Sequence, residues 1–225
     1  MRVKTQLIPL LALTLSLGSC MQSPEGEKVT STEASSIDIP EGATRINVTL
    51  NESNIEWIGT KPTGTHFGSL SIKEGVLYLK DGDLAGGVFT MDMNSIKVED
   101  IEDPKTNKQL VDHLKSPDFF LTDSFPTSKF EFSKVTAFKS DTVEFEKVQP
   151  THRIEGNLTM RGITRKVNFP ARIEISNGDI MAQTPQFIIN RTEWDVNYGS
   201  KSVFTNLKDN FIHDEIALRI NLTTE

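Results

Sequence analysis

HRIEGNLTMRGITRKVNFPARIEIS, residues 152–176, is the stretch that decides the fold. Apolar and polar side chains alternate along both of its halves, and Arg161-Gly162 lies between them. A period of two is typical of a half-buried antiparallel strand, and a short glycine-containing turn between two such runs indicates a hairpin. The apolar side carries Ile154, Gly156, Leu158 and Met160 in the first run and Val167, Phe169, Ala171, Ile173 and Ile175 in the second. We therefore expect two long neighbouring strands, each with one face in a core.

The same alternation recurs over most of the chain after residue 44. Ile216, Leu218, Ile220 and Leu222 alternate with polar or small residues, and Phe130 and Phe132 share one face of KFEFSKV (129–135). Further strand candidates cover 45–50, 55–59, 69–73, 76–80, 87–93 and 181–189. Glu74-Gly75, Asp81-Gly82 and Asn177-Gly178-Asp179 are short hairpin signals between strands. About ten antiparallel strands predict an all-β fold with a closed or nearly closed sheet, because closure removes exposed edges.

One segment interrupts this rhythm. Asp103-Pro104 has the form of an N-cap followed by proline at the first helical position, and Leu110, Val111 and Leu114 recur at helical spacing. This pattern predicts a short helix over about 104–115, inserted between two strands. The stretch HLKSPDFFLTDSFP (113–126) follows it, and its phenylalanines are expected to plug one end of the barrel.

The N-terminus has the pattern of a bacterial lipoprotein signal. Arg2 and Lys4 precede the apolar run LIPLLALTLSL (7–17), which is too short to span a bilayer, and Leu17-Gly18-Ser19-Cys20 resembles a lipobox. Cys20 is the only cysteine, so the chain has no internal disulfide, and acylation gives this thiol a use. The alternative is an ordinary signal peptide with a chance cysteine.

The pattern divides the chain into three parts. We expect a signal peptide over 1–19, an acylated Cys20 with a flexible tether over 20–43, and one barrel domain over 44–225. The tether prediction rests on the Ser, Thr, Glu, Gly and Pro content of 21–43, which leaves little to bury.

Composition and motifs exclude several classes of function. A net charge of −7 and a pI near 5.2 argue against general nucleic-acid binding, which needs a basic surface. The four histidines show no metal-ligand spacing, and G-x-S-x-G and P-loop motifs are missing from the sequence. We therefore expect no catalytic residues, no metal and no cofactor. The 13 phenylalanines fit a barrel interior that is either filled or holds one small ligand, and the residues alone leave both open.

Five blocks of sequence resemble the YceI-like family of bacterial polyisoprenoid-binding proteins. The blocks are THFGSLSIKEG (65–75) with GVFTMDMNSI (87–96), DHLKSPDFF (112–120), FPTSKFEFSKV (125–135), HRIEGNLTMRGITRKVNFP (152–170) and FIINRTEWDV (187–196). The chain departs from many relatives in its lipobox and tether, and 197–214 follows the family pattern only loosely.

The resemblance implies an extended lipocalin-like antiparallel barrel of about eight main strands, with a polyisoprenoid of the quinone or prenyl-phosphate class inside. The residues expected to bind it are Phe67, Phe119, Phe120, Phe130, Phe132, Ile154, Leu158, Val167, Phe169, Phe187 and Ile189. His66, His113 and Arg161 are the candidates near the headgroup. The N-terminal signal, and not the resemblance, predicts a location in the bacterial cell envelope, as a periplasm-facing or surface lipoprotein of the outer membrane. The expected partners are an isoprenoid lipid and the membrane that holds the anchor, with no nucleic acid and an open oligomeric state. A structural or interaction module without ligand is the alternative.

Overall fold

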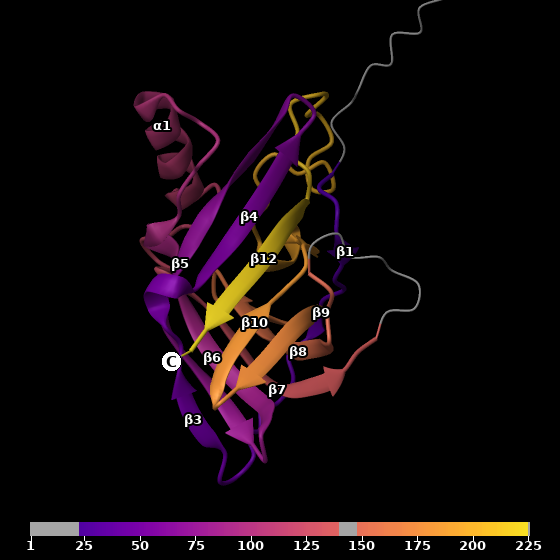
Figure 1. Ribbon diagram of the computed structural model, residues 1–225. Helices are drawn as coiled ribbons and strands as arrows, with labels where there is room; N and C mark the ends of the chain where they lie inside the picture. Colours follow the sequence, from indigo (N-terminus) through magenta and orange to yellow (C-terminus); the bar gives the residue numbers. More distant parts are fainter. Residues whose placement is uncertain (1–22, 140–147, 225) are drawn as a thin grey trace, which may run out of the picture.

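Eight antiparallel strands close into a barrel in the computed structural model, which describes residues 23–139 and 148–224 (Figure 1). The barrel strands are β4 (Asn54–Lys61), β5 (Gly64–Lys80), β6 (Asp83–Asp92), β7 (Thr127–Ala137), β8 (His152–Met160), β9 (Ile163–Ser176), β10 (Asp179–Gln183) and β12 (Glu215–Thr223). Each pairs with the next, and β12 closes the ring because it pairs with both β10 and β4. The predicted all-β barrel with one short helix is confirmed.

Four shorter strands lie against this ring. The strand β3 (Thr44–Asn47) pairs with β5, and β11 (Phe187–Asn190) pairs with β12 beyond the end of β10. The two remaining strands are β1 (Glu27–Lys28), parallel to β11, and β2 (Thr32–Glu33), which pairs with β9. Within residues 23–139 and 148–224 there are also three 3-10 helices, namely η1 (Leu50–Glu52), η2 (Met93–Ser95) and η3 (Arg191–Trp194).

Two predicted strand boundaries are wrong. The runs 69–73 and 76–80 belong to the single strand β5, and the supposed turn at Glu74-Gly75 lies next to a register shift between Ile72 and Glu74. Such a bulge bends a long strand without ending it. A Cβ at Gly75 would lie 2.9 Å from the Val48 side chain, so this glycine serves close packing and not a turn. The run 181–189 is instead interrupted at 184–186, which separates β10 from β11.

The inserted helix α1 (Pro104–Lys115) has the predicted bounds. The Asp103 carboxylate accepts a hydrogen bond from the Thr106 backbone N–H at 2.8 Å, which caps the first turn. Leu114 is buried, and Leu110 packs against the barrel core. Among the described residues no helix is long and apolar enough to cross a membrane.

The segment predicted as a flexible tether has defined contacts from residue 25 onward. The Glu27 carboxylate lies 2.6 Å from the Arg153 guanidinium, and the Asn157 side chain forms two hydrogen bonds with the Ser35 backbone. These contacts differ from the flexible tether expected for 20–43. The expectation rested on side-chain composition, which shows only that the segment has little apolar surface to bury. The segment is held instead by its backbone, which pairs with β9 and β11. Residues 20–22 and the predicted signal peptide 1–19 lie outside the described residues.

Gly68 on β5 occupies a position that has no room for a side chain. A Cβ built there would lie 1.9 Å from the Lys97 carbonyl oxygen and 3.0 Å from the Trp57 ring. The neighbouring strand β4 contains a glycine of the opposite kind, because a Cβ at Gly59 meets nothing within 4 Å.

We expect Gly68→Ala to lower the free energy of unfolding by about 3 kcal/mol, because the added methyl group must displace backbone. Gly59→Ala is the matched control and should leave the midpoint of urea unfolding nearly unchanged. Equal midpoints for the two variants would contradict the close approach of residue 97 to β5.

Candidate functional site

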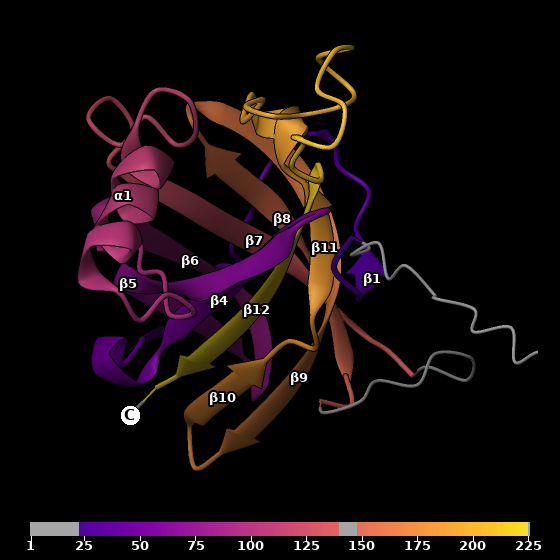
Figure 2. The ribbon, with the colours of Figure 1, turned by 90° about the horizontal axis from the view of Figure 1, so that it is seen from above.

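The barrel contains a cavity of about 350 Å³ at the end that carries α1 and the loop 191–214. This volume lies within the usual range for small-molecule pockets, which is about 300–1,000 Å³. Both segments lie at the upper end of the barrel in Figure 1, and Figure 2 shows them on different sides of the ring. The apolar walls include Ile55, Leu70, Phe89, Met91, Phe130, Leu158, Val167, Phe169, Phe187, Ile189, Ile216, Leu218 and Ile220. These side chains share the inward face because alternate residues of a strand point to the same side.

A layer of phenylalanines forms the floor of this cavity. Phe130 lies 5.5 Å from Phe89 and 5.3 Å from Phe169, and Phe169 stacks on Phe187 at 4.5 Å between ring centroids. Phe89, Phe130 and Phe169 also border a second cavity of only about 30 Å³ on the other side of the layer. The barrel is therefore packed in one half and hollow in the other.

Three aromatic rings meet at the mouth. The His113 ring on α1 lies 4.9 Å from Phe119 and 4.7 Å from Tyr198, both edge-to-face, and Phe119 lies 5.2 Å from Tyr198. All three residues line the cavity. This cluster joins the helical side of the mouth to the loop on the other side.

His66 and Asp100 form a polar pair beside the cavity. The His66 Nδ1 lies 2.8 Å from Asp100 Oδ2, and the Phe67 backbone N–H donates to Asp100 Oδ1 at 3.0 Å. Burial raises the pKa of Asp100, but the hydrogen bonds from Phe67 and His66 outweigh it and leave this pKa below its usual value. The ionised carboxylate accepts the proton of Nδ1, which holds the His66 ring in place at the cavity that it lines.

Trp57 supplies a second polar group on the same wall. Its indole N–H is buried and has no hydrogen-bond partner among the described residues, although Trp57 lines the cavity. Since β4 pairs with β5 through Trp57–Gly68 and Gly59–His66, Trp57 and His66 share the inward face of this hairpin. A buried N–H without a partner costs about 1–3 kcal/mol, so this position favours a ligand acceptor. The sequence analysis missed Trp57, although Ile55, Trp57 and Gly59 alternate as the wall strands do.

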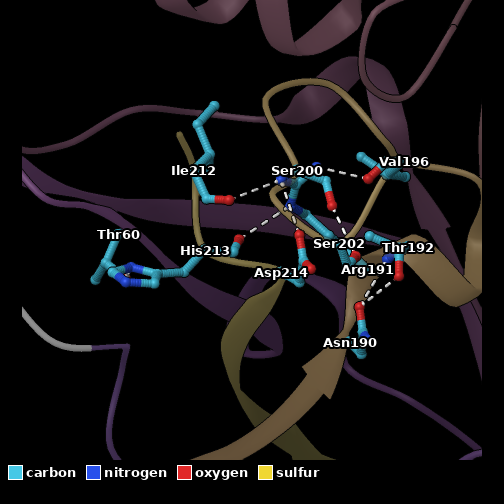
Figure 3. Close-up of polar contacts among 10 residues, drawn as sticks. All are labelled: Thr60, Asn190, Arg191, Thr192, Val196, Ser200, Ser202, Ile212, His213 and Asp214. Carbon is cyan, nitrogen blue, oxygen red and sulfur yellow. Dashed lines mark hydrogen bonds and ion pairs between the residues drawn. The ribbon is translucent and has the colours of Figure 1, made fainter. Parts of the chain in front are cut away.

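Arg191 is a buried cation that holds the loop 191–214 (Figure 3). Its side chain is 2% exposed and donates to the carbonyl oxygens of Val196 at 2.5 Å, His213 at 3.1 Å and Ile212 at 3.2 Å. The Asp214 carboxylate lies 3.7 Å away. Burial lowers the pKa of Arg191, and the charge of Asp214 opposes this shift. Its donors are thus directed to the protein itself, so Arg191 positions the mouth loop.

Most of the predicted ligand-binding residues lie around the main cavity. Those that line it are Phe119, Phe120, Phe130, Leu158, Val167, Phe169, Phe187 and Ile189, together with the headgroup candidates His66 and His113. Phe132 and Ile154 line the smaller cavity instead. Phe132 lies two residues beyond Phe130 on β7, a rise of about 7 Å, and this places it below the aromatic layer.

Phe67 and Arg161 lie outside both cavities. Phe67 is adjacent to His66, so its side chain points to the outer face and is 45% exposed. Arg161 lies in the β8–β9 turn, where its guanidinium donates to the Phe119 carbonyl oxygen and lies 3.4 Å from Asp195 Oδ2. It connects the turn to the residues after α1. Cys20 lies outside the described residues.

Metal binding and catalysis were the other kinds of site considered for the mouth. Among the described residues no group of three or more His, Cys, Asp or Glu side chains is placed to hold a metal ion. The expectation that the protein has no catalytic residues stays a prediction.

A closed antiparallel barrel with an apolar interior cavity defines the lipocalin-like class. A model of the YceI-like domain matches residues 43–224, and the chain belongs to the YceI-like family. No curated protein is similar enough in sequence to count as a match.

Solved structures share the fold at low identity. BcnA of Burkholderia cenocepacia superposes with a TM-score of 0.58 and 17% identity, over 79% of this chain and 99% of that one. A domain from Saccharophagus degradans, described as polyisoprenoid binding and implicated in plant cell wall breakdown, gives 0.54 and 11% identity over 80% and 97% of the two chains. A mutant of the Campylobacter jejuni YceI protein gives 0.50 and 18% identity over 68% and 82%.

Removal of the Arg191 charge should destabilise the protein strongly. We expect Arg191→Met to lower the free energy of unfolding by about 3 kcal/mol or more, because three carbonyl groups and Asp214 lose their partner. Chemical denaturation measures this. The control is Arg172→Met, whose partner Glu174 is half exposed, and its cost should stay below about 1 kcal/mol. A small effect at Arg191 would show that the loop 191–214 is held by other contacts.

Proposed function

We propose that this protein binds a polyisoprenoid-type amphiphile of the quinone or prenyl-phosphate class, with the tail in the barrel and the headgroup at the mouth. The observation that carries the proposal is the hollow half of the barrel, whose walls are mostly apolar. Each CH₂ group that leaves water contributes about 0.8 kcal/mol, so a prenyl tail binds strongly without polar contacts.

Membership of the YceI-like family supports this proposal, as does the likeness of the fold to a Saccharophagus domain described as polyisoprenoid binding. The packed lower half of the barrel also supports it. The aromatic layer of Phe89, Phe130 and Phe169 separates the main cavity from the smaller one, so the tail is proposed to enter from the mouth and to end at this layer.

The headgroup is proposed to lie near Trp57 and His66. The unpartnered indole N–H of Trp57 suits an oxygen acceptor, which both quinones and prenyl phosphates carry. His66 is held by Asp100 and adds a group that donates when protonated. Lys61 also lines the cavity at the end of β4, where a cation suits an anionic headgroup.

The protein is further proposed to be a lipoprotein of the bacterial cell envelope, anchored through Cys20 and facing the periplasm or the surface at the outer membrane. Support comes from the signal pattern of residues 1–20. A binding role, not a catalytic one, is proposed because the mouth combines an apolar cavity with few polar groups.

The first test is mass spectrometry of organic-solvent extracts from the protein, purified without detergent from its native host. The chain from residue 21 onward keeps every described residue and omits the acylation site. A stoichiometric isoprenoid quinone or prenyl phosphate is the expected result. A blank extract, repeated after candidate isoprenoids have been offered, would contradict the proposal and favour the alternative, an interaction module without ligand.

Filling the cavity should remove the ligand without unfolding the barrel. Ile216 on β12 lines the cavity and is the paired neighbour of Gly59 on β4. A Cβ at Gly59 would meet nothing within 4 Å, so there is open space beside Ile216 for a larger side chain. We expect Ile216→Trp to reduce the extracted isoprenoid at least about tenfold, since the indole occupies the volume that the tail needs. Met181→Trp, on the outer face of β10, is the control and should retain the ligand. Unchanged ligand content in a folded Ile216→Trp protein would place the tail elsewhere.

The Trp57 indole N–H is expected to bind the headgroup. Trp57→Phe removes this donor and keeps an aromatic ring, so affinity for the extracted isoprenoid should fall by about twofold to tenfold, the value of one hydrogen bond. Titration of ligand-free protein measures this change. The same substitution should leave affinity for a headgroup-free hydrocarbon of equal length unchanged. A parallel loss for both ligands would assign Trp57 to the tail.

A further inference from the structure

The loop 197–211 exposes two adjacent large apolar side chains. Val203 is 46% exposed and Phe204 is 49% exposed. Among the described residues, Val203 and Phe204 are the only two exposed large apolar side chains that are adjacent in the sequence. The loop is the yellow segment at the upper end of the barrel in Figure 1, which is the end with the mouth.

The exposure of this tip is fixed by the contacts beneath it. The Phe204 backbone N–H donates to the Ser200 carbonyl oxygen at 2.9 Å, and the Ile212 N–H donates to the Gly199 carbonyl oxygen at 2.8 Å. Ser200 is fully buried. Below it, Arg191 holds the carbonyl groups of Val196 and Ile212, as Figure 3 shows. The loop therefore presents Val203 and Phe204 outward from a firm base.

The apolar tip continues into the cavity. Tyr198 and Ile212, at the two ends of the same loop, line the cavity. Tyr198 is also 43% exposed, so it borders both the interior and the surface. The loop that carries Val203 and Phe204 therefore borders the cavity at both of its ends.

The charge of the loop is opposite to that of the whole protein. The loop 197–211 contains Lys201, Lys208 and Asp209, which together give it a net charge of +1, whereas the chain has a net charge of −7. The Lys201 ammonium lies 3.4 Å from the centroid of the Phe211 ring, so this loop carries a positive charge two residues before Val203. Lysines next to exposed aromatic and aliphatic side chains are typical of segments that enter the interface of an anionic bilayer.

We propose that the tip formed by Val203 and Phe204 inserts into the interface of a lipid bilayer and turns the barrel mouth toward that bilayer. Two side chains are too small for a specific protein interface, which buries about 1,200–2,000 Å², but they suffice for shallow insertion into lipid. The inferred consequence is direct passage of the ligand between bilayer and cavity. That consequence rests on the proposed function, whereas the membrane contact itself does not.

The test is flotation of the chain from residue 21 onward with vesicles of phosphatidylethanolamine and phosphatidylglycerol. Omission of Cys20 ensures that an acyl anchor does not mask the loop. The double variant Val203→Asp/Phe204→Asp should reduce the vesicle-bound to free ratio about tenfold, since two half-exposed apolar side chains no longer leave water. Met181→Asp, of equal exposure on the outer face of β10, is the control and should float like the unchanged protein.

A second variant keeps the test independent of any folding defect. Phe204→Trp should preserve flotation, and its emission, after subtraction of the signal that Trp57 and Trp194 give in the unchanged protein, should shift to shorter wavelength when vesicles are added. Flotation that is equal for the double variant and the unchanged protein, or equally reduced in the Met181→Asp control, would overturn the proposal. Lack of a spectral shift in Phe204→Trp would overturn it as well. So would concentration-dependent self-association in place of vesicle binding, because the tip would then contact a second copy.

Ligand transfer separates this inference from the proposed function. Vesicles loaded with menaquinone-4 serve as the donor, and quenching of the fluorescence of Trp57, measured in a Trp194→Phe background, reports arrival in the cavity. The double variant should take up the quinone about tenfold more slowly, with an unchanged final level, because the tip acts on access and not on affinity. If the unchanged protein floats with vesicles but neither takes up menaquinone-4 nor yields an isoprenoid on extraction, the proposed function fails and the membrane contact stands.

If the double variant and the unchanged protein take up the quinone at equal rates and float equally, the membrane contact fails and the proposed function stands.

Discussion

The pairing of β12 with β4 is the constraint on which the rest of the structure depends. Six residues of β12 pair with six residues of β4, which joins the last strand of the ring to its first strand. Closure leaves the ring no unpaired edge, and its eight strands set an interior just wide enough to be filled with side chains or to hold one small ligand. The other edge of β12 is shared between β11 and β10, so β11 contributes Phe187 and Ile189 to the wall.

One half of the barrel interior is filled with side chains, and the other half is hollow. Below the aromatic layer, side chains such as Leu77, Phe132 and Ile154 fill the interior. Above the layer, the ring is covered by α1 on one side and by the loop 191–214 on the other, and neither segment fills it. The loop is held at the mouth of the barrel by Arg191. The guanidinium of this residue is buried at the end of β11, and it donates hydrogen bonds to three carbonyl groups of the loop. A buried charge requires such partners, and meeting this need gives the mouth a defined shape.

Much of the candidate site could be predicted from the sequence. The alternation around Phe130, Leu158, Val167 and Phe169 identified the inward faces, because side-chain direction in a strand follows from local geometry alone. Phe67 was predicted to bind the ligand, but its side chain points outward, and the inward side chain at this point of β5 belongs to its neighbour His66. Phe132 was assigned to the correct face but lies in the filled half, and the depth of a residue in the barrel depends on strand stagger, which no local pattern reports. Trp57 had a usable signal in Ile55 and Gly59, whereas Arg191 had none, because its partners come from residues 196–214 of an irregular loop.

The sequence by itself determined the class of fold, the inward faces of the strands and the bounds of α1, because period two, helical spacing and an N-cap are local properties of the chain. Only the tertiary structure decided that 64–80 is one bulged strand, that the backbone of 25–35 is docked along the barrel, and that His66 and Trp57 share a wall with an unpartnered N–H. These features arise from contacts between residues far apart in the chain, such as Gly75 with Val48 and Asn157 with Ser35. The hollow half of the barrel belongs to the same group, because a cavity is a property of how all the walls meet and not of any one strand.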